Sequence, residues 1–580
     1  MDFRWWDEAH AILWRIADSA ELLEVRRNAR QAAHDRLAPL LEEAHPSHEW
    51  TEEKSRMLRA LDALGLTSIL ASAHNGLAQR LALTVWELAC VDAGVATCSL
   101  SGSLAQMPIR DFGTEPQRGR YLGRADLRHG ALCLTEPLPG AGADAISLTG
   151  RMSIAGVSTN GEPLLQIHKR GRFISHMDFA QFVVAAVEGD GKAVRGSSLV
   201  ILEPGDEGEF TRGSPVRKLG HRFASTTDPV FRLIVPASRL VGGFTMEQGS
   251  LIPRFSHRIL LERALRRMRA LLGLMTAAKA LSTVQACFAS STLRSDSAEF
   301  QLDMADLWAT GEAAASLGFF ATRLSDNLDE TEDRSSGDAK LAALFSPAAK
   351  LFSSRSIPEC LRQASAWGGS DPAATADLRA RLIDAQIEDM YMGPAAVQRR
   401  LVSAFMIDTR FLAEFQKWTG EIDALAERAP QAGMRSLAEG MRLWQWTLER
   451  LRQQADAQGF LLYCDARQGV TFAMADALCG LLAARSLALD VFEIERAHHA
   501  QDSVCASIFC DLSTLASCRA AARVSQTCAE LLVGYAPRFS VSSSERRAFA
   551  ELRTKLFVSL RGMMDTRERI AEFLRTGNVI

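Results

Sequence analysis

The sequence has no excess of charge of either sign. Its 66 basic and 69 acidic residues give a net charge of -3, so no overall field attracts nucleic acid or an anionic membrane surface. It also has no run that approaches the roughly 20 consecutive apolar residues of a membrane helix. Met1–Glu8 carries charges inside its first apolar stretch, unlike a secretory signal. We therefore expect no membrane span and no nucleic-acid partner.

Cysteines are present but lack the paired spacing of a metal site. The chain has 11 of them, an odd number, scattered from Cys90 onward. Glu495 and His498 have the Glu-x-x-His spacing of carboxylate-bridged metal bundles, but a second such set is missing. We expect no metal, and reduced thiols in a cytoplasmic protein.

Length and hydrophobic periodicity predict several domains. A chain of 580 residues, 47% of them hydrophobic, is too long to fold around a single hydrophobic core. The pattern is helical from Leu22 to about Gly130. Between Leu132 and Leu240 it changes to β-rich runs, among them Phe182–Val187 and Ser198–Leu202, with an Asp-Gly hairpin signal between them.

The remainder, after Gly249, is again helical. Apolar residues recur three or four apart from Leu261 to Met275. The polar, acidic stretch Ser325–Lys340 predicts an exposed loop. Ser436 and Glu439 have the spacing of a capping box, which predicts a helix start in the last part of the chain.

Several stretches resemble signatures of the acyl-CoA dehydrogenase family, in the family's order from about Trp50 to Ile407. A strand ends in Thr-Glu-Pro and is followed by a Gly-Ala-Gly-x-Asp loop, where small residues let a ligand approach the backbone. The other matching stretches are Phe112–Gln117, Gly171–Ser175, Lys218–Thr226 with Phe231 and Val235-Pro236, Trp367–Gly369, Asp384–Ile387 and Met390–Gly393.

The resemblance implies an α+β multidomain fold. It places an N-terminal helical domain at residues 1–130, a β-barrel-like middle domain at 131–243 and a four-helix bundle at 244–415. Residues 416–580 are expected to form an extra helical domain, as in the long members of the family. The family's cofactor sites are built across subunits, which implies a homodimer or tetramer.

The resemblance also implies FAD as cofactor and an acyl thioester, carried by CoA or a carrier protein, as substrate. Substrate contacts are expected at Ala143, which stands where the family has a serine, and at Arg222. The expected flavin contacts are Leu134, Thr135, Phe173, Ser175, Gly368 and Gly369.

The catalytic base of the family is not at its usual position. Removing the α-proton of an acyl thioester needs a carboxylate with a raised pKa. Where the family commonly has the glutamate of Tyr-Glu-Gly, this chain has Met392, and a thioether does not take a proton. Some members carry the glutamate on the helix after the β-domain, before an arginine, and Glu262 fits that local pattern. Glu262 is therefore the candidate base.

Two further cofactor contacts of the family are replaced. Ser290 stands where an arginine of a neighbouring subunit pairs with the flavin pyrophosphate, and Ser365 where a glutamine precedes Gly-Gly. The first interpretation is α,β-dehydrogenation of an acyl thioester. The alternatives are a flavin monooxygenase of the same fold, which needs no α-proton base, and a catalytically silent subunit of a hetero-oligomer with an intact homologue.

Overall fold

The computed structural model describes residues 4–43, 49–67, 69, 76–122, 129–137, 148–289, 297–330, 337–366, 372–428, 432–497, 503–536 and 542–577. The chain divides into two compact units. The sheet unit comprises Glu24–Met268 and Tyr391–Gly393. The bundle unit comprises Met1–Leu23, Arg269–Met390 and Pro394–Ile580.

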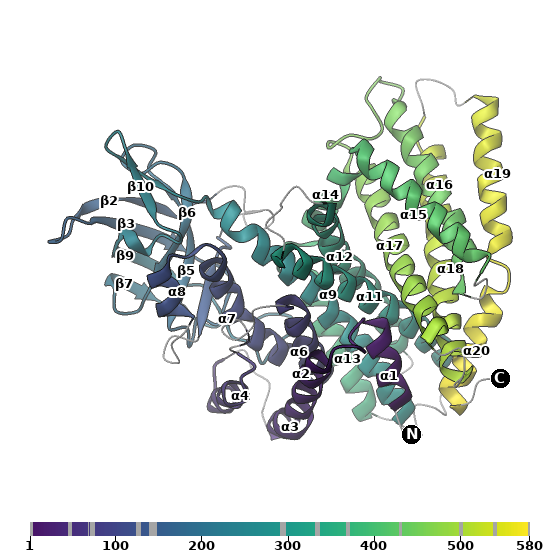
Figure 1. The fold of residues 1–580 in the computed structure, drawn as a ribbon, viewed down its shortest axis with the longest axis horizontal. Helices are drawn as coiled ribbons and strands as arrows, with labels where there is room; N and C mark the ends of the chain where they lie inside the picture. Colours follow the sequence, from purple (N-terminus) through teal and green to yellow (C-terminus); the bar gives the residue numbers. More distant parts are fainter. Residues whose placement is uncertain are drawn as a thin grey trace. The chain divides into compact units, whose positions relative to one another are not determined.

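The sheet unit begins with a layer of helices (Figure 1). Its last short helix, α8 (Glu115–Tyr121), starts with a capping box in which Thr114 and Gln117 each satisfy the other's backbone N–H. The helices before it are α2 (Ala20–Gln31), the π-helix η1 (Ala32–Leu37), α3 (Ala38–Glu43), α4 (Glu52–Ala63), α6 (Leu77–Val91) and α7 (Ala93–Phe112).

A seven-stranded sheet follows, in the order β1-β5-β2-β3-β9-β7, with β6 paired to β5 (Figure 1). Smaller two-stranded ribbons are formed by β4 with β8 and by β10 with β11. The strands are β1 (Gly130–Cys133), β2 (Arg151–Val157), β3 (Pro163–Arg170), β4 (Ile174–Ser175), β5 (Phe182–Gly189), β6 (Ser197–Leu202), β7 (Glu207–Thr211), β8 (Thr226–Thr227), β9 (Val230–Pro236), β10 (Phe244–Glu247) and β11 (Ser250–Pro253).

The central strand β5 is apolar on both faces because two separate cores flank it. Val183 and Val187 belong to a core formed by residues of the sheet and its ribbons. Phe182 and Val184 point the other way, into a core that also contains Ile109 of α7. The unbroken apolar run that predicted β5 is thus the pattern of a strand buried on both sides.

The predicted hairpin is confirmed as an antiparallel pair, with Val184 opposite Ile201. Its connection, Asp190–Gly196, is longer than the two-residue turn that Asp-Gly favours. The Asp190 carboxylate accepts the backbone N–H groups of Lys192 and Val194 at 2.9 and 3.0 Å, which orders this longer turn.

The bundle unit is built of helices. It contains most of α9 (His257–Ala289), and α11 (Ala298–Glu330) packs along α12 (Gly337–Ala366). The helices α17 and α18 lie side by side, with α16 against both (Figure 1). The others are α1 (Arg4–Leu13), α13 (Pro372–Ile387), α14 (Ala395–Phe405), α15 (Thr409–Ala426), α16 (Met434–Gln453), α17 (Gln468–Ala497), α18 (Ser503–Val533), α19 (Ser543–Ser559) and α20 (Met563–Thr576).

The N-terminal helix α1 is fixed to this unit by a buried polar contact. His10 Nε2 lies 3.1 Å from the carboxylate of Glu312 on α11, and Trp308 Nε1 donates to the same carboxylate at 3.0 Å. Trp5 also meets Phe573 of α20 edge to face, with ring centroids 5.9 Å apart. The first and last helices of the chain therefore belong to one packed body.

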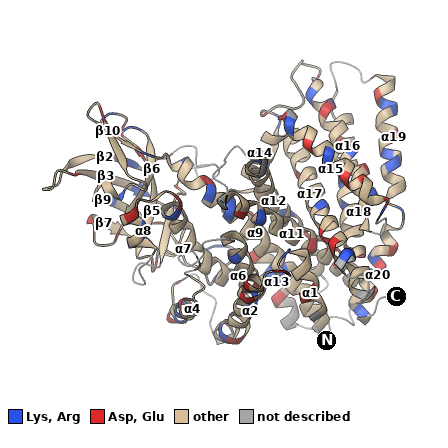
Figure 2. Ribbon diagram, in the orientation of Figure 1, with Lys and Arg blue, Asp and Glu red and all other residues tan. Residues whose placement is uncertain are grey.

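Among the described helices, α9 and α17 are long and apolar enough to cross a membrane by length and composition, although each also carries charged residues (Figure 2). This corrects the expectation that no stretch approaches that limit. The apolar window is 89% buried inside the protein in α9 and 72% buried in α17, as in core helices of a bundle. The absence of a membrane span stays a prediction.

Other local predictions are wrong. The described ends of Ser325–Lys340 are helical and not loop, since α11 continues to Glu330, α12 begins at Gly337, and Ser325 and Asp326 are buried; residues 331–336 lie outside the described residues. Ser325 is accommodated because its hydroxyl donates to the Ala321 carbonyl at 3.0 Å, inside the helix.

The predicted capping box at Ser436 and Glu439 is also wrong, because α16 starts earlier, after Gly433. The Ser436 hydroxyl donates instead to the Ser559 carbonyl at 2.7 Å, and Glu439 pairs with Arg442 at 2.8 Å. Both side chains therefore serve contacts that a local pattern does not reveal.

Candidate active site

The Thr-Glu-Pro segment leaves the sheet at the end of β1 and is attached to the turn before β4. The Arg172 N–H donates to the Thr135 carbonyl at 2.9 Å. Leu134 and Thr135 are half-buried. Two stretches that the sequence assigned to the flavin, Leu134-Thr135 and Gly171–Ser175, are thus brought together by the sheet unit.

Glu136, the middle residue of Thr-Glu-Pro, is buried inside the sheet unit. Its carboxylate lies 2.5 Å from the Lys169 ammonium and accepts the backbone N–H groups of Thr149 and Gly150 at 2.6 and 2.8 Å. Burial by itself raises the pKa of Glu136, but the Lys169 charge and these donors outweigh it and hold the pKa below its ordinary value. Glu136 is therefore ionised and joins β3 to the segment before β2, and its carboxylate is not free to contact a ligand.

Phe173 and Ser175 lie on a strained, partly open turn. Phe173 has a φ of 57°, in the left-handed region, and its ring is 51% exposed. Its N–H donates to the Asp228 carboxylate at 2.8 Å, which holds that conformation. Ser175 pairs with Thr226 in the ribbon of β4 and β8, so the Gly171–Ser175 and Lys218–Thr226 stretches meet here.

His176, directly after Ser175, is fully buried and also has a positive φ of 71°. Neither of its ring nitrogens has a hydrogen-bond partner within the described part of the chain. Burial, with a smaller effect of His129, lowers the pKa of His176 to about 3, so the ring is neutral. The strain at Phe173 and His176 brackets the short strand that carries Ser175.

The Tyr391-Met392-Gly393 turn contacts His221, the residue before Arg222. Thr97 Oγ1 lies 3.1 Å and Tyr391 Oη 3.5 Å from His221 Nδ1. Arg222 is exposed. Met392 is half-buried with a φ of 56°, an uncommon backbone for a residue with a Cβ atom.

Glu262 is exposed on α9. Its neighbours Leu260 and Leu261 are buried in the core beneath the sheet, so the helix face that carries Glu262 points away from that core. Glu262 is therefore in contact with solvent, whereas a catalytic carboxylate of this kind is commonly shielded from water.

A buried charged cluster lies in the bundle unit just before the Met390–Gly393 turn. Glu388 accepts the Thr276 hydroxyl at 2.7 Å and pairs with the Lys279 ammonium, and all three side chains are buried. Burial lowers the pKa of the nearby Lys350 ammonium to about 7. Because Glu388 is already occupied by these partners, it is not available as a base.

The remaining predicted positions are described only in part. Ser365 is half-buried at the end of α12, where its hydroxyl donates to the Arg362 carbonyl at 3.0 Å. The positions outside the described residues are Ala143, Ser290, Gly368, Gly369 and His498, and the side chain of Glu495.

The comparisons with known proteins point to one family. Residues 19–125 match the family model described as acyl-CoA dehydrogenase, N-terminal domain. A crystal structure of an acyl-CoA dehydrogenase complexed with FAD from Bacillus anthracis superposes with a TM-score of 0.77 at 17% identity, covering 96% of this chain and 95% of that chain. This chain has the acyl-CoA dehydrogenase fold, and the family resemblance is confirmed.

Curated relatives agree. The short-chain-specific acyl-CoA dehydrogenase of Megasphaera elsdenii is 32% identical over 237 residues, 38% of this chain and 59% of the relative. The acyl-CoA dehydrogenase of Bacillus subtilis is 25% identical over 415 residues, 67% of this chain and 98% of the relative. The chain spans 54% to 59% of the length of the first three curated relatives that it matches.

The predicted fold class is confirmed, including the helical extension, because the match to the acyl-CoA dehydrogenase structure extends over nearly the whole chain. The sequence motifs missed two residues that shape the candidate site. The sequence did not predict that Glu136 pairs with Lys169, because a carboxylate beside a binding loop is as typical of a ligand contact as of a buried ion pair. His176 was overlooked because nothing in the sequence signals a positive φ at a histidine.

Proposed function

We propose that this protein is a FAD-dependent oxidoreductase of the acyl-CoA dehydrogenase type that acts on an acyl thioester, bound to CoA or to a carrier protein. The observation that carries the proposal is the joining of Leu134-Thr135 to the Phe173–Ser175 turn through the Arg172 N–H. We further propose a homodimer or tetramer as its working form.

The residues of this turn fit a flat ring with a polar edge. Phe173 is about half exposed; the Arg172 guanidinium lies over its ring at 4.7 Å from the centroid, and a flat ring would stack on the opposite face. The hydroxyls of Thr135 and Ser175 have no hydrogen-bond partner in the described ranges, and each is able to donate to a polar ring atom. When bound, FAD supplies the acceptor for the β-hydride.

The chain's own residues would bind the thioester and move its α-proton. Arg222, exposed and without an ion pair within the described residues, is proposed to hold the substrate. Glu262 is proposed as the base that takes the α-proton when the substrate is bound. Met392 contributes an apolar surface at the usual position of the base.

The proposal is tested first by the flavin content of the purified protein. We expect stoichiometric FAD, seen in the visible spectrum and by chromatography of the released cofactor, and bleaching of that spectrum by an acyl-CoA under anaerobic conditions. Absence of flavin after reconstitution with FAD would overturn the proposal.

Replacing Glu262 by glutamine tests the proposed base. We expect the rate of bleaching by acyl-CoA to fall by at least about 100-fold, because a general base typically contributes that much. The flavin content is expected to stay unchanged. Glu247→Gln, at another exposed glutamate of the sheet unit, is the matched control and should leave the rate unaltered. Undiminished bleaching in the Glu262→Gln protein would refute this assignment.

A second candidate is a catalytically silent subunit that partners an intact homologue. It is favoured by two observations together, Met392 at the usual position of the base and the solvent exposure of Glu262. This candidate predicts co-purification of a stable complex with the homologue and activity that does not depend on Glu262. The monooxygenase alternative predicts instead oxygen incorporation that depends on reduced flavin.

A further inference from the structure

An open pocket of about 390 Å³ lies in the sheet unit, between α8, the 3-10 helix η3 (Ala237–Arg239) and the ribbon of β10 and β11. None of the flavin or substrate positions discussed above lines it. Its lining includes no acidic residue among Thr114, Pro116, Gln117, Arg120, Tyr121, Ser238, Arg239, Gly242, Gly243, Phe244 and Arg254. The pocket is therefore a separate, basic hollow.

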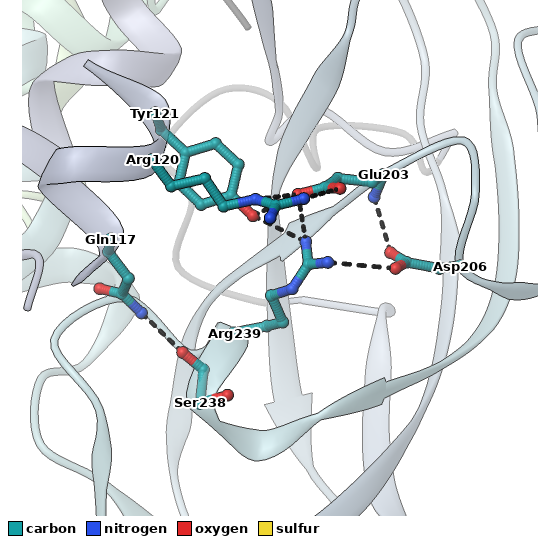
Figure 3. Close-up of polar contacts among 7 residues, drawn as sticks. All are labelled: Gln117, Arg120, Tyr121, Glu203, Asp206, Ser238 and Arg239. Atoms are coloured by element: carbon teal, nitrogen blue, oxygen red, sulfur yellow. Dashed lines mark hydrogen bonds and ion pairs between the residues drawn. The ribbon is translucent and has the colours of Figure 1, made fainter. Parts of the chain in front are cut away.

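Two of its arginines form ion pairs with carboxylates that are not part of the lining (Figure 3). Arg239 donates to Glu203 at 2.7 Å and to the Tyr121 hydroxyl at 2.7 Å, and it lies 3.4 Å from Asp206. Arg120 donates to Glu203 at 3.0 and 2.6 Å through Nε and Nη2. These contacts fix the planes of both guanidinium groups.

Both guanidinium groups keep donors for a ligand. Arg239 Nε and Arg120 Nη1 carry N–H groups that have no partner in the described part of the chain. The Tyr121 hydroxyl has no proton left to donate to a ligand, since it donates to Glu203 while it accepts from Arg239. Burial, together with this bond to Glu203, raises the pKa of Tyr121, so the phenol adds no negative charge to the wall.

The third arginine, Arg254, has no side-chain partner in the described part of the chain. It follows β11, is exposed, and makes no side-chain hydrogen bond or ion pair within the described residues. Its backbone N–H donates to the Gly243 carbonyl at 3.1 Å, which ties it to the pocket wall. Three guanidinium groups therefore line this hollow, and the nearby carboxylates of Glu203, Asp206 and Glu162 lie outside its lining, Glu162 accepting the Ser238 N–H at 2.7 Å.

The walls of the pocket are rigid. The Gln117 side chain donates to the carbonyls of Ser238 and Leu240, both at 2.8 Å, and accepts the Gly242 N–H at 3.1 Å. This links α8 to the segment that carries Arg239 (Figure 3). Gly242 has a φ of 81°, and a Cβ atom there would lie 2.6 Å from the Phe255 ring. The backbone around the hollow is therefore set before any ligand arrives.

From these features we propose that this pocket binds a phosphate group, either as free phosphate or as the phosphate of a small ester. The donors come from three different segments of the chain: α8, η3 and the residue that follows β11. A tetrahedral phosphate accepts several such donors at once, and guanidinium groups bind it with good geometry. A planar carboxylate, in contrast, fits the two parallel donors of one guanidinium group better than it fits several donors from separate segments.

The probes are inorganic phosphate, pyrophosphate, adenosine monophosphate and succinate, each titrated into the full-length protein by calorimetry. We expect saturable binding of at least one phosphate probe with a Kd of about 1 mM or lower, weakened by added salt. Tighter binding of the monophosphate ester than of inorganic phosphate would identify an ester ligand, and the reverse a free phosphate. Equal binding of succinate, or no binding of any phosphate probe, would overturn the proposal.

Arg254→Ala is the decisive variant, because it breaks no side-chain hydrogen bond or ion pair within the described residues. We expect it to weaken phosphate binding by about 10-fold or more, the value of one charge-assisted hydrogen bond. Arg254→Lys should restore part of the affinity. Arg232→Ala, at an exposed arginine of the same unit that pairs with Glu209, is the control. Binding that is unchanged in Arg254→Ala, or equally lost in the control, would refute the site.

Discussion

Replacing Lys169 by methionine is expected to lower the free energy of unfolding of the sheet unit by about 3–5 kcal/mol. The Lys169 and Glu136 side chains are 0% and 1% exposed. Without the ammonium group, Glu136 is left as a buried carboxylate with only two backbone donors. The loss of its counter-charge is the reason for the large effect.

The effect is measured by chemical denaturation and by hydrogen exchange of the amides of β3 and β5, which report on this unit directly. Arg232→Met is the matched control, because it breaks an exposed pair with Glu209. Exposed pairs contribute about 0–1 kcal/mol. A loss in Lys169→Met no larger than in the control would show that the buried pair does not stabilise the sheet.

The same pair predicts how the stability depends on pH. The pKa of Glu136 is lowered in the folded protein, so its contribution is fully present above the unfolded pKa of about 4.3 and is lost as the pH falls through the lower, folded value. In Lys169→Met, burial is left as the dominant influence and raises the pKa of Glu136. The acid unfolding midpoint of the variant should therefore lie at higher pH than that of the parent.

Replacing Lys279 by methionine is expected to destabilise the bundle unit by a similar amount, about 3–5 kcal/mol. Lys279 is 2% exposed and Glu388 is 1% exposed at the side chain, and Thr276 supplies one neutral donor to Glu388. The single substitution leaves a buried carboxylate without its cation. It is measured by the shift in the denaturation midpoint of the helical signal.

A double variant sharpens this second prediction. Exchanging both Lys279 and Glu388 for methionine removes the whole pair, and we expect most of the lost stability to return, because apolar replacements of buried pairs are often neutral. Arg362→Met, which breaks an exposed pair with Glu359 on α12, is the control. If the double variant were as unstable as Lys279→Met, the buried charge would not be the cause.

The order of the elements was predictable from the sequence because long apolar stretches report burial directly. The continuous run at Phe182–Val187 predicted a strand, and the structure shows why, since alternate residues of β5 enter two cores. The family motifs also indicated that Thr135 and the Phe173–Ser175 turn come together, which the hydrogen bond from Arg172 to Thr135 accomplishes.

Polar residues were the main source of error, because their environment is set by distant parts of the chain. Asp326 looked like part of a solvated loop, yet it is buried near the end of α11. Ser436 looked like a helix cap, yet it bonds to Ser559, more than a hundred positions away. The basic pocket was missed for the same reason, since Arg120, Arg239 and Arg254 come from three separate stretches of the sequence.

The backbone conformation at Met392 bears on the exchange of this residue for the glutamate that acyl-CoA dehydrogenases commonly have here. Met392 and Gly393 have φ values of 56° and 83°, so the turn adopts a conformation that costs about 1–3 kcal/mol for a residue with a Cβ atom. Glutamate, which like methionine is unbranched at Cβ, would carry a similar strain at 392. Exchange between a thioether and a carboxylate here is therefore conformationally neutral, and a lineage is able to lose or regain an acidic group at this point without refolding the turn.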